Sequence, residues 1–204
     1  MQRLLDGYRR FRATTWPAQQ ARFEALAGGQ RPQTMVIACS DSRADPQMIF
    51  DAAPGELFVV RNVAALAPPY RPDGGLHGVS AALEFGVRVL RVKTIVVMGH
   101  ARCGGIAALL EGAPETAREF VEPWMRLALP ALARAGCSAD GEATQEACER
   151  EVVKVSLENL RTFPWISEPE AAGDLKLVGA HFAIATGVLW TTGAGEGFEA
   201  VESG

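Results

Sequence analysis

Three side chains that commonly bind metal ions occur in two short stretches of the sequence. Cys39 lies in ACSDSRADP, and His100 and Cys103 lie in HARCGG. Alone, a histidine three residues before a cysteine is a weak pattern, because a capping histidine and a buried thiol would give it too. Two thiolates and one imidazole together are a set with which catalytic zinc keeps its fourth position open. The combination predicts a Zn²⁺ site with these three residues as ligands.

Asp41 and Arg43 follow Cys39 at alternate positions. They indicate what occupies the fourth coordination position of the zinc ion. In extended chain, residues two apart project to the same side, so the carboxyl group lies beside the thiol and the guanidinium beside the carboxyl group. Asp41 can bind the metal and close the site, or Arg43 can hold it off so that it accepts a hydrogen bond from metal-bound water. A solvated surface ion pair is the plainer interpretation, but it explains neither the cysteine nor the buried context.

The elements that carry these residues are those of an α/β fold with a mainly parallel central sheet. Continuous apolar runs at 34–38, 56–60 and 93–99 are typical of strands buried on both faces. The segment 75–92 has apolar residues at helical spacing and predicts a crossover between the second and third strands. Ligands of such sheets bind at the carboxyl ends of the strands, where the first and third runs deliver the cysteines and the histidine.

The remaining segments complete a single expected domain, residues 1–204. Helices flank the sheet, and the amphipathic N-terminal segment predicts a helical arm that wraps a neighbouring subunit. The expected parts are an arm at 1–30, a catalytic α/β core at 31–192 with further helices at 114–135 and 143–161 and two last strands within 175–192, and a weakly ordered tail at 193–204.

Composition narrows the classes of function. The chain has 204 residues, of which 48% are hydrophobic, which is enough for one sizeable core. A net charge of −4 without a basic run argues against nucleic acid as a partner. No apolar stretch has the length of a signal peptide or a membrane span, so we expect a cytoplasmic protein without a membrane partner. Cys137 and Cys148 lack ligand spacing and are expected to be free thiols.

The two stretches together resemble a known family. CSDSR followed by GHARCGG is similar to the paired signature of the β-class carbonic anhydrases, and PGELFVVRNVAALAPPY resembles a strand of that family. The similarity runs from about Gly29 to Gly112. The resemblance implies a zinc enzyme that interconverts carbon dioxide and bicarbonate, with Cys39, His100 and Cys103 as ligands. The chemistry agrees, because zinc lowers the pKa of bound water from about 15.7 toward neutrality and so creates an attacking hydroxide.

By resemblance, the pocket is of the family's open, constitutively active type. Gln30 stands where that type carries a substrate-binding glutamine, and Phe58 matches its aromatic residue. Val36 and Phe182 replace the tryptophan and tyrosine of the family's regulatory bicarbonate site. In the family the glutamine and the aromatic residue come from the neighbouring subunit, so the resemblance implies a homodimer or a higher homo-oligomer.

Other pocket positions follow from the same resemblance. Val63 and Gly104 would join Phe58 in lining an apolar pocket for carbon dioxide. Phe85 departs from the pattern, since it occupies the position of a pocket tyrosine and lacks the hydroxyl group. Arg61, which the regulatory site would also use, is interpreted as part of a structural ion pair.

Two other functions fit the same ligands. A hydrolase of carbonyl sulfide or carbon disulfide would keep every ligand and differ only in its pocket. A non-catalytic zinc-binding interaction protein is also conceivable, although a structural zinc site normally has a fourth Cys or His ligand. His77 and His181 are candidates for shuttling protons, but the sequence shows no partner for either of them.

Overall fold

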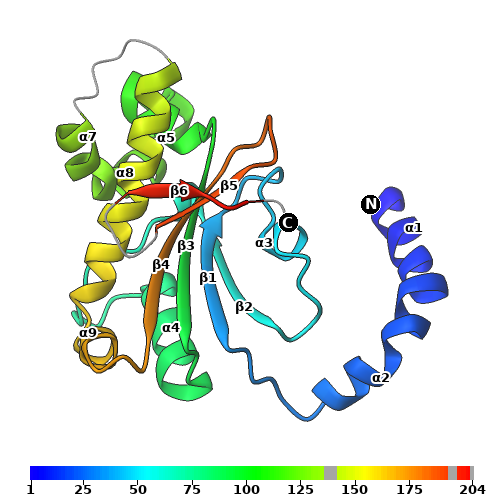
Figure 1. Cartoon of the computed structure of the whole chain (residues 1–204). Coiled ribbons are helices and arrows are strands. Elements are labelled where there is room, and N and C mark those ends of the chain that lie inside the picture. The colour runs from blue at the N-terminus through cyan, green and yellow to red at the C-terminus, as the bar shows by residue number, and fades with distance from the viewer. Residues whose placement is uncertain (136–141, 193–196, 203–204) are drawn as a thin grey trace.

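The computed structural model describes residues 1–135, 142–192 and 197–202, with a six-stranded sheet at the centre (Figure 1). The strand order is β2-β1-β3-β4-β5-β6. The first four strands in this order pair in parallel, and β5 and β6 are added antiparallel. The expected mainly parallel sheet is therefore confirmed. The strands are β1 (Thr34–Cys39), β2 (Leu57–Asn62), β3 (Thr94–His100), β4 (Lys176–Phe182), β5 (Leu189–Thr192) and β6 (Phe198–Ala200).

The apolar runs predicted β1, β2 and β3 to within two residues. β1 is buried at every position after its first residue, as expected of a strand with neighbours on both sides and helices or loops on both faces. The two faces differ in their cover. Met35 and Ile37 pack on one face against α4, α8 and α9, and Val36 and Ala38 pack on the other beside Phe50, at the end of α3.

The helices differ from the expectation in one region. They are α1 (Gln2–Arg10), α2 (Trp16–Leu26), α3 (Pro46–Ile49), α4 (Gly78–Glu84), α5 (Gly104–Glu111), α6 (Val121–Met125), α7 (Leu129–Ala135), α8 (Glu142–Arg161) and α9 (Pro164–Ala171). The single helix expected over 114–135 is wrong. Pro123 and Pro130 lie in the first turns of α6 and α7, where proline is tolerated, and proline does not continue a preceding helix. No helix in the described part of the chain is both long and apolar enough to cross a membrane.

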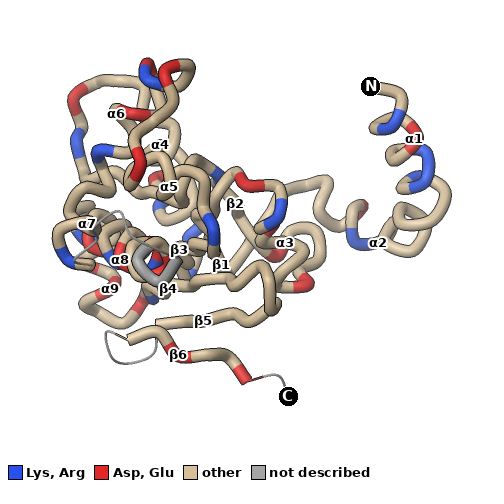
Figure 2. Tube along the Cα trace, turned by 90° about the horizontal axis from the view of Figure 1, so that it is seen from above, with Lys and Arg blue, Asp and Glu red and all other residues tan. Residues whose placement is uncertain are grey.

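The N-terminal arm is helical and stands away from the sheet (Figures 1 and 2). Its two helices, α1 and α2, are joined by a π-helical turn, and neither contains a buried residue. Arg22 anchors the arm, donating to the Pro54 carbonyl at 2.6 Å and to Glu56 at 2.9 Å. Most of the arm's apolar surface is therefore uncovered within one chain.

The C-terminal tail is more regular than expected. The glycine-rich sequence predicted a weakly ordered segment, whereas Phe198–Ala200 forms β6 along β5. The Arg150 guanidinium lies 4.7 Å from the Trp190 ring centroid and 5.8 Å from that of Phe198, and such cation–π contacts stabilise the added strand. Residues 193–196 and 203–204 of the expected tail lie outside the described residues.

A glycine in β4 leaves room for a side chain of α8, which gives a first prediction. A Cβ added at Gly179 in β4 would lie 2.9 Å from the side chains of Val153 and Thr192. We expect Gly179→Ala to lower the free energy of unfolding by about 1–3 kcal/mol, as overpacking in a core does. Gly78→Ala in α4 is the control, because its Cβ would meet open space. Denaturant unfolding measures both, and equal stabilities would contradict the prediction.

Candidate metal centre

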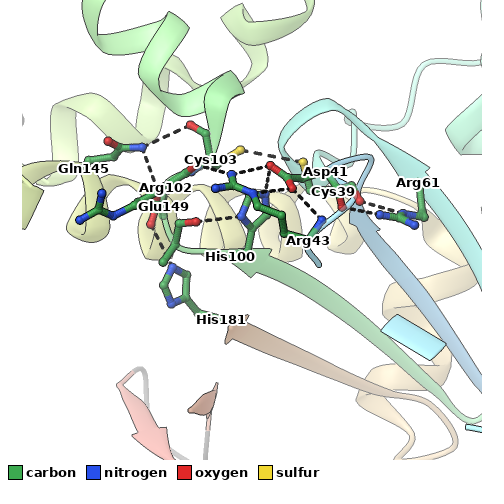
Figure 3. Close-up of polar contacts among 11 residues, drawn as sticks. Cys39, Asp41, Arg43, Arg61, His100, Arg102, Cys103, Gln145, Glu149 and His181 are labelled. Carbon is green, nitrogen blue, oxygen red and sulfur yellow. Dashed lines mark hydrogen bonds and ion pairs between the residues drawn. The ribbon is translucent and has the colours of Figure 1, made fainter. Parts of the chain in front are cut away.

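Cys39, His100 and Cys103 meet at the carboxyl edge of the sheet, as the strand pattern predicted. Cys39 ends β1, His100 ends β3, and Cys103 immediately precedes α5. Their ligand atoms all lie within 4.8 Å of one another, and no more than 6% of any of the three residues is exposed. Figure 3 shows the three side chains at the junction of these elements.

His100 is oriented so that one ring nitrogen is available to a metal. Its Nδ1 lies 2.9 Å from the Ala101 carbonyl oxygen, so Nδ1 carries the proton and donates it. The other nitrogen, Nε2, is buried and has no hydrogen-bond partner among the described residues. A buried acceptor without a partner is unfavourable unless a cation binds it.

The spacing of the sulfur atoms fits zinc. The Sγ atoms of Cys39 and Cys103 are 3.9 Å apart. Two thiolates bound at about 2.3 Å in a tetrahedral arrangement would lie about 3.8 Å apart. The cavity among the ligands measures about 10 Å³, roughly the room for one small ion or water. Within the described residues, no fourth cysteine or histidine joins the group.

The charges of the pocket also favour a cation. A hydrogen bond from the Cys103 thiol lowers the pKa of Cys39 to about 4, against the opposing effect of burial. The same hydrogen bond, reinforced by burial, raises the pKa of Cys103 far above its ordinary value. Burial alone would lower the pKa of His100, but its contact with the Cys39 thiolate outweighs burial and the pKa is raised. Without a metal, Cys39 is therefore a thiolate while Cys103 keeps its proton, which a divalent cation would displace on binding.

Asp41 and Arg43 form the expected pair beside these ligands. Nε and Nη2 of Arg43 donate to the two carboxyl oxygens of Asp41 at 2.9 and 2.7 Å, and the Arg43 amide adds a bond of 2.9 Å. The side-chain bonds from Arg43 are the main reason why the pKa of Asp41 lies well below its usual range. Oδ2 of Asp41 is 3.8 Å from Nε2 of His100, so the carboxylate faces the open side of the ligands.

Arg61 fixes the backbone around the first ligand. It donates to the Cys39 carbonyl at 2.9 Å, to the Asp41 carbonyl at 2.6 Å and to Oδ2 of Asp45 at 2.9 Å. Asp45 in turn caps the N-terminus of α3. The structural ion pair expected for Arg61 is therefore present, and it holds the chain that follows β1.

The expected pocket residues divide into two groups. Val63 packs in the same hydrophobic cluster as the two ligand cysteines, and Gly104 directly follows Cys103. Phe58 and Phe85 contact each other, with ring centroids 5.9 Å apart, but Phe58 pairs with Met35, near the opposite end of β1 from Cys39.

Gln30 belongs with the second group. It is exposed and precedes the start of β1, whereas Cys39 ends this strand, and a six-residue strand is about 16 Å long. One chain therefore does not bring Gln30, Phe58 and Phe85 to its own ligands. Of the other two cysteines, Cys148 is buried outside the ligand group and Cys137 lies outside the described residues.

Sequence reasoning missed Glu149 and the partner of His181. Oε1 of Glu149 accepts a hydrogen bond from the Cys103 amide at 2.9 Å, and its Oε2 lies 3.1 Å from Nε2 of His181. The position of Glu149 in the sequence could have indicated that it has a buried partner. It shares a helical stripe of α8 with the buried residues Val152, Val153 and Ser156, and a charged residue at such a position requires a buried partner.

Comparisons with known proteins agree with this geometry. Residues 34–189 match the family model described as carbonic anhydrase. Beta carbonic anhydrase 3 of Arabidopsis thaliana is 36% identical, over 93% of this chain and 76% of that protein. The solved β-carbonic anhydrase CcaA is 33% identical with a TM-score of 0.85, over 100% of this chain and 92% of CcaA.

A second solved structure extends the comparison. It is one of two tetrameric β-carbonic anhydrases from the ascomycete Sordaria macrospora, 26% identical with a TM-score of 0.81, over 95% of this chain and 96% of that one. The family model spans most of the chain, and its match includes all three ligands. The chain therefore belongs to the β-class carbonic anhydrases, the zinc enzymes that catalyse the reversible hydration of carbon dioxide to bicarbonate.

Proposed function

We propose that this chain is a carbonic anhydrase of the open-site type, in which Asp41 stays off the zinc ion and the enzyme is active without a regulatory ligand. The observation that carries this proposal is the threefold hydrogen bonding of Asp41 by Arg43. A carboxylate whose two oxygens are both engaged by a guanidinium loses those bonds if it turns to a metal. Val36 and Phe182, at the positions of the regulatory tryptophan and tyrosine, support the same proposal.

In this proposal Cys39, His100 and Cys103 hold zinc through two Sγ atoms and Nε2. When bound, zinc supplies the Lewis acidity that makes a water molecule nucleophilic near neutral pH. Asp41 would accept a hydrogen bond from this water and so orient it toward the carbon of carbon dioxide. Its lowered pKa keeps the carboxyl group ionised, and therefore an acceptor, near neutral pH.

We further propose that the substrate pocket is completed by a second copy of the chain. Val63 and Gly104 lie beside their own ligands, whereas Gln30, Phe58 and Phe85 do not. Phe85 is 44% exposed, and the arm leaves its apolar surface uncovered, which supports burial of this region against another subunit. The Sordaria macrospora relative is a tetramer. Gln30 of one copy would then donate a hydrogen bond to substrate oxygen in the other, while Phe85 contributes only apolar contact.

The thiol ligands favour a reducing compartment, and we propose the cytoplasm. Cys39 and Cys103 are close enough that oxidation to a disulfide would remove two of the three ligands.

The dyad gives a prediction about catalysis. Asp41→Asn loses the charged acceptor but not the ligands, so we expect kcat to fall by about 10²-fold or more with zinc retained. Arg43→Ala releases Asp41 toward the metal and should also lower kcat. Arg43→Lys keeps the positive charge but lacks the planar guanidinium group, so it should recover only part of the lost kcat. Stopped-flow hydration and elemental analysis of zinc measure these effects. Wild-type turnover in Asp41→Asn would contradict the role of Asp41.

The ligand set gives a prediction about pH. Two thiolates donate more charge to zinc than imidazoles do, so the bound water is less acidic and the hydration rate should rise from about pH 6 to about pH 9. Asp41 does not cause the rise, because its pKa is lowered and the group is already ionised throughout this range. His77→Gln is the control, since His77 is partly exposed and bonded to Asp73, apart from the ligands. A flat hydration profile, or one that changes in His77→Gln, would contradict this assignment.

The shared pocket predicts complementation between two impaired variants. One chain carries Gln30→Ala and the other Asp41→Asn, and two affinity tags allow the mixed dimer to be isolated. If glutamine acts on the other copy, one of the two sites has both residues intact, so activity should recover to about half that of the wild type.

The two parental homodimers are the controls, and both should be slow. If Gln30 instead acts within its own chain, each site of the mixed dimer still lacks one residue. Activity no higher than that of the parents would therefore contradict the shared pocket while leaving the zinc chemistry intact.

A further inference from the structure

Glu149 of α8 is a buried acidic residue that connects three elements around one zinc ligand. It is 3% exposed. Its Oε1 accepts from the Cys103 amide at 2.9 Å, and its Oε2 lies 3.1 Å from Nε2 of His181 in β4. Gln145, one turn earlier in α8, donates to Oε1 at 3.1 Å and to the Cys103 carbonyl at 3.3 Å. Figure 3 shows this network on the side of Cys103 away from Arg61.

The turn that carries Cys103 needs such support. Arg102, immediately before the ligand, has a φ of +55°, a left-handed conformation that costs free energy in a residue with a side chain. Strained turns persist only where their surroundings fix them. Here Arg43 donates to the Arg102 carbonyl at 3.1 Å, and Glu149 and Gln145 bond the amide and the carbonyl of Cys103.

Glu149 does not act as a metal ligand in this arrangement. Both of its carboxyl oxygens are engaged by protein groups, and it does not belong to the cluster of ligand atoms. A buried carboxyl group is costly unless its hydrogen bonds are satisfied, so its place in the fold depends on His181, Gln145 and the Cys103 amide. Glu149 thus connects α8 and β4 to the backbone of the turn that carries Cys103.

We propose that Glu149 is a positioning residue that fixes the Cys103 peptide so that Sγ stays directed at the other two ligands, and that it thereby sets the rate at which zinc is released. His181 holds Glu149 in place from β4. The proposal concerns retention of the metal and goes beyond the open-site function, since it depends neither on Asp41 nor on a second copy of the chain.

The test measures zinc release from the holoenzyme into excess chromogenic chelator. Glu149→Ala removes the acceptor of the Cys103 amide, and we expect release to become about 10- to 100-fold faster, the usual effect of losing a group that supports a ligand. Glu149→Gln keeps Oε1 as an acceptor for that amide, and its amide group can donate to His181. We therefore expect Glu149→Gln to release zinc within about threefold of the wild-type rate.

A matched control separates positioning from general loss of stability. Ser156→Ala removes another buried polar side chain of α8, whose hydroxyl bonds Ala65 and Ala67 rather than the ligand turn. It should lower the unfolding midpoint of the metal-free protein but leave zinc release near the wild-type rate. Should Glu149→Ala give no soluble protein, Glu149→Asp replaces it, because a side chain one methylene shorter does not span from α8 to both partners.

A spectroscopic readout reports the ligand itself. In the cobalt-substituted protein, the thiolate-to-metal absorption should weaken or shift in Glu149→Ala, persist in Glu149→Gln and stay unchanged in Ser156→Ala. Zinc release from Glu149→Ala at the wild-type rate would overturn the proposal. So would equally fast release from Glu149→Gln and Glu149→Ala, or from Ser156→Ala and Glu149→Ala.

Discussion

The two sulfur atoms of Cys39 and Cys103 lie 3.9 Å apart in a buried pocket, and two thiolates so close repel each other unless a cation lies between them. The neighbouring residues His100 and Asp41 add no uncompensated negative charge to the two sulfur atoms. His100 presents Nε2 without a hydrogen-bond partner among the described residues, and the carboxylate of Asp41, which faces the ligands, is neutralised by Arg43. The result is a buried site with room for one small ion.

Much of this arrangement could be predicted because it depends on short stretches of sequence. Apolar runs indicate the strands, and parallel strands bring their carboxyl ends to one edge, so the sequence alone predicts that Cys39 and His100 lie together. The alternation of Asp41 and Arg43 likewise needs only an extended backbone. These are local rules, and they held to within two residues in β1, β2 and β3.

The features that sequence did not predict depend on contacts between distant segments. Glu149 and His181 are 32 residues apart, and their pairing requires knowing how α8 packs on β4. The tail looked weakly ordered because the stacking of Arg150 on Trp190 and Phe198, which supports β6, is equally remote in sequence. The helical pieces between α5 and α8 are different, because Pro123 and Pro130 in the sequence already indicate that a single helix does not continue through 114–135.

Gly99 in β3 and Gly179 in β4 have a consequence for the metal as well as for the core. A methyl group at either position would collide with Val153, and at Gly99 it would also contact the Glu149 carbonyl oxygen. These glycines therefore set the depth at which α8 rests on the sheet, and that depth determines whether the Glu149 side chain reaches the Cys103 amide. Because both positions lack a side chain, α8 packs close to the sheet. The distance between the helix and the sheet therefore affects the geometry of the ligand Cys103.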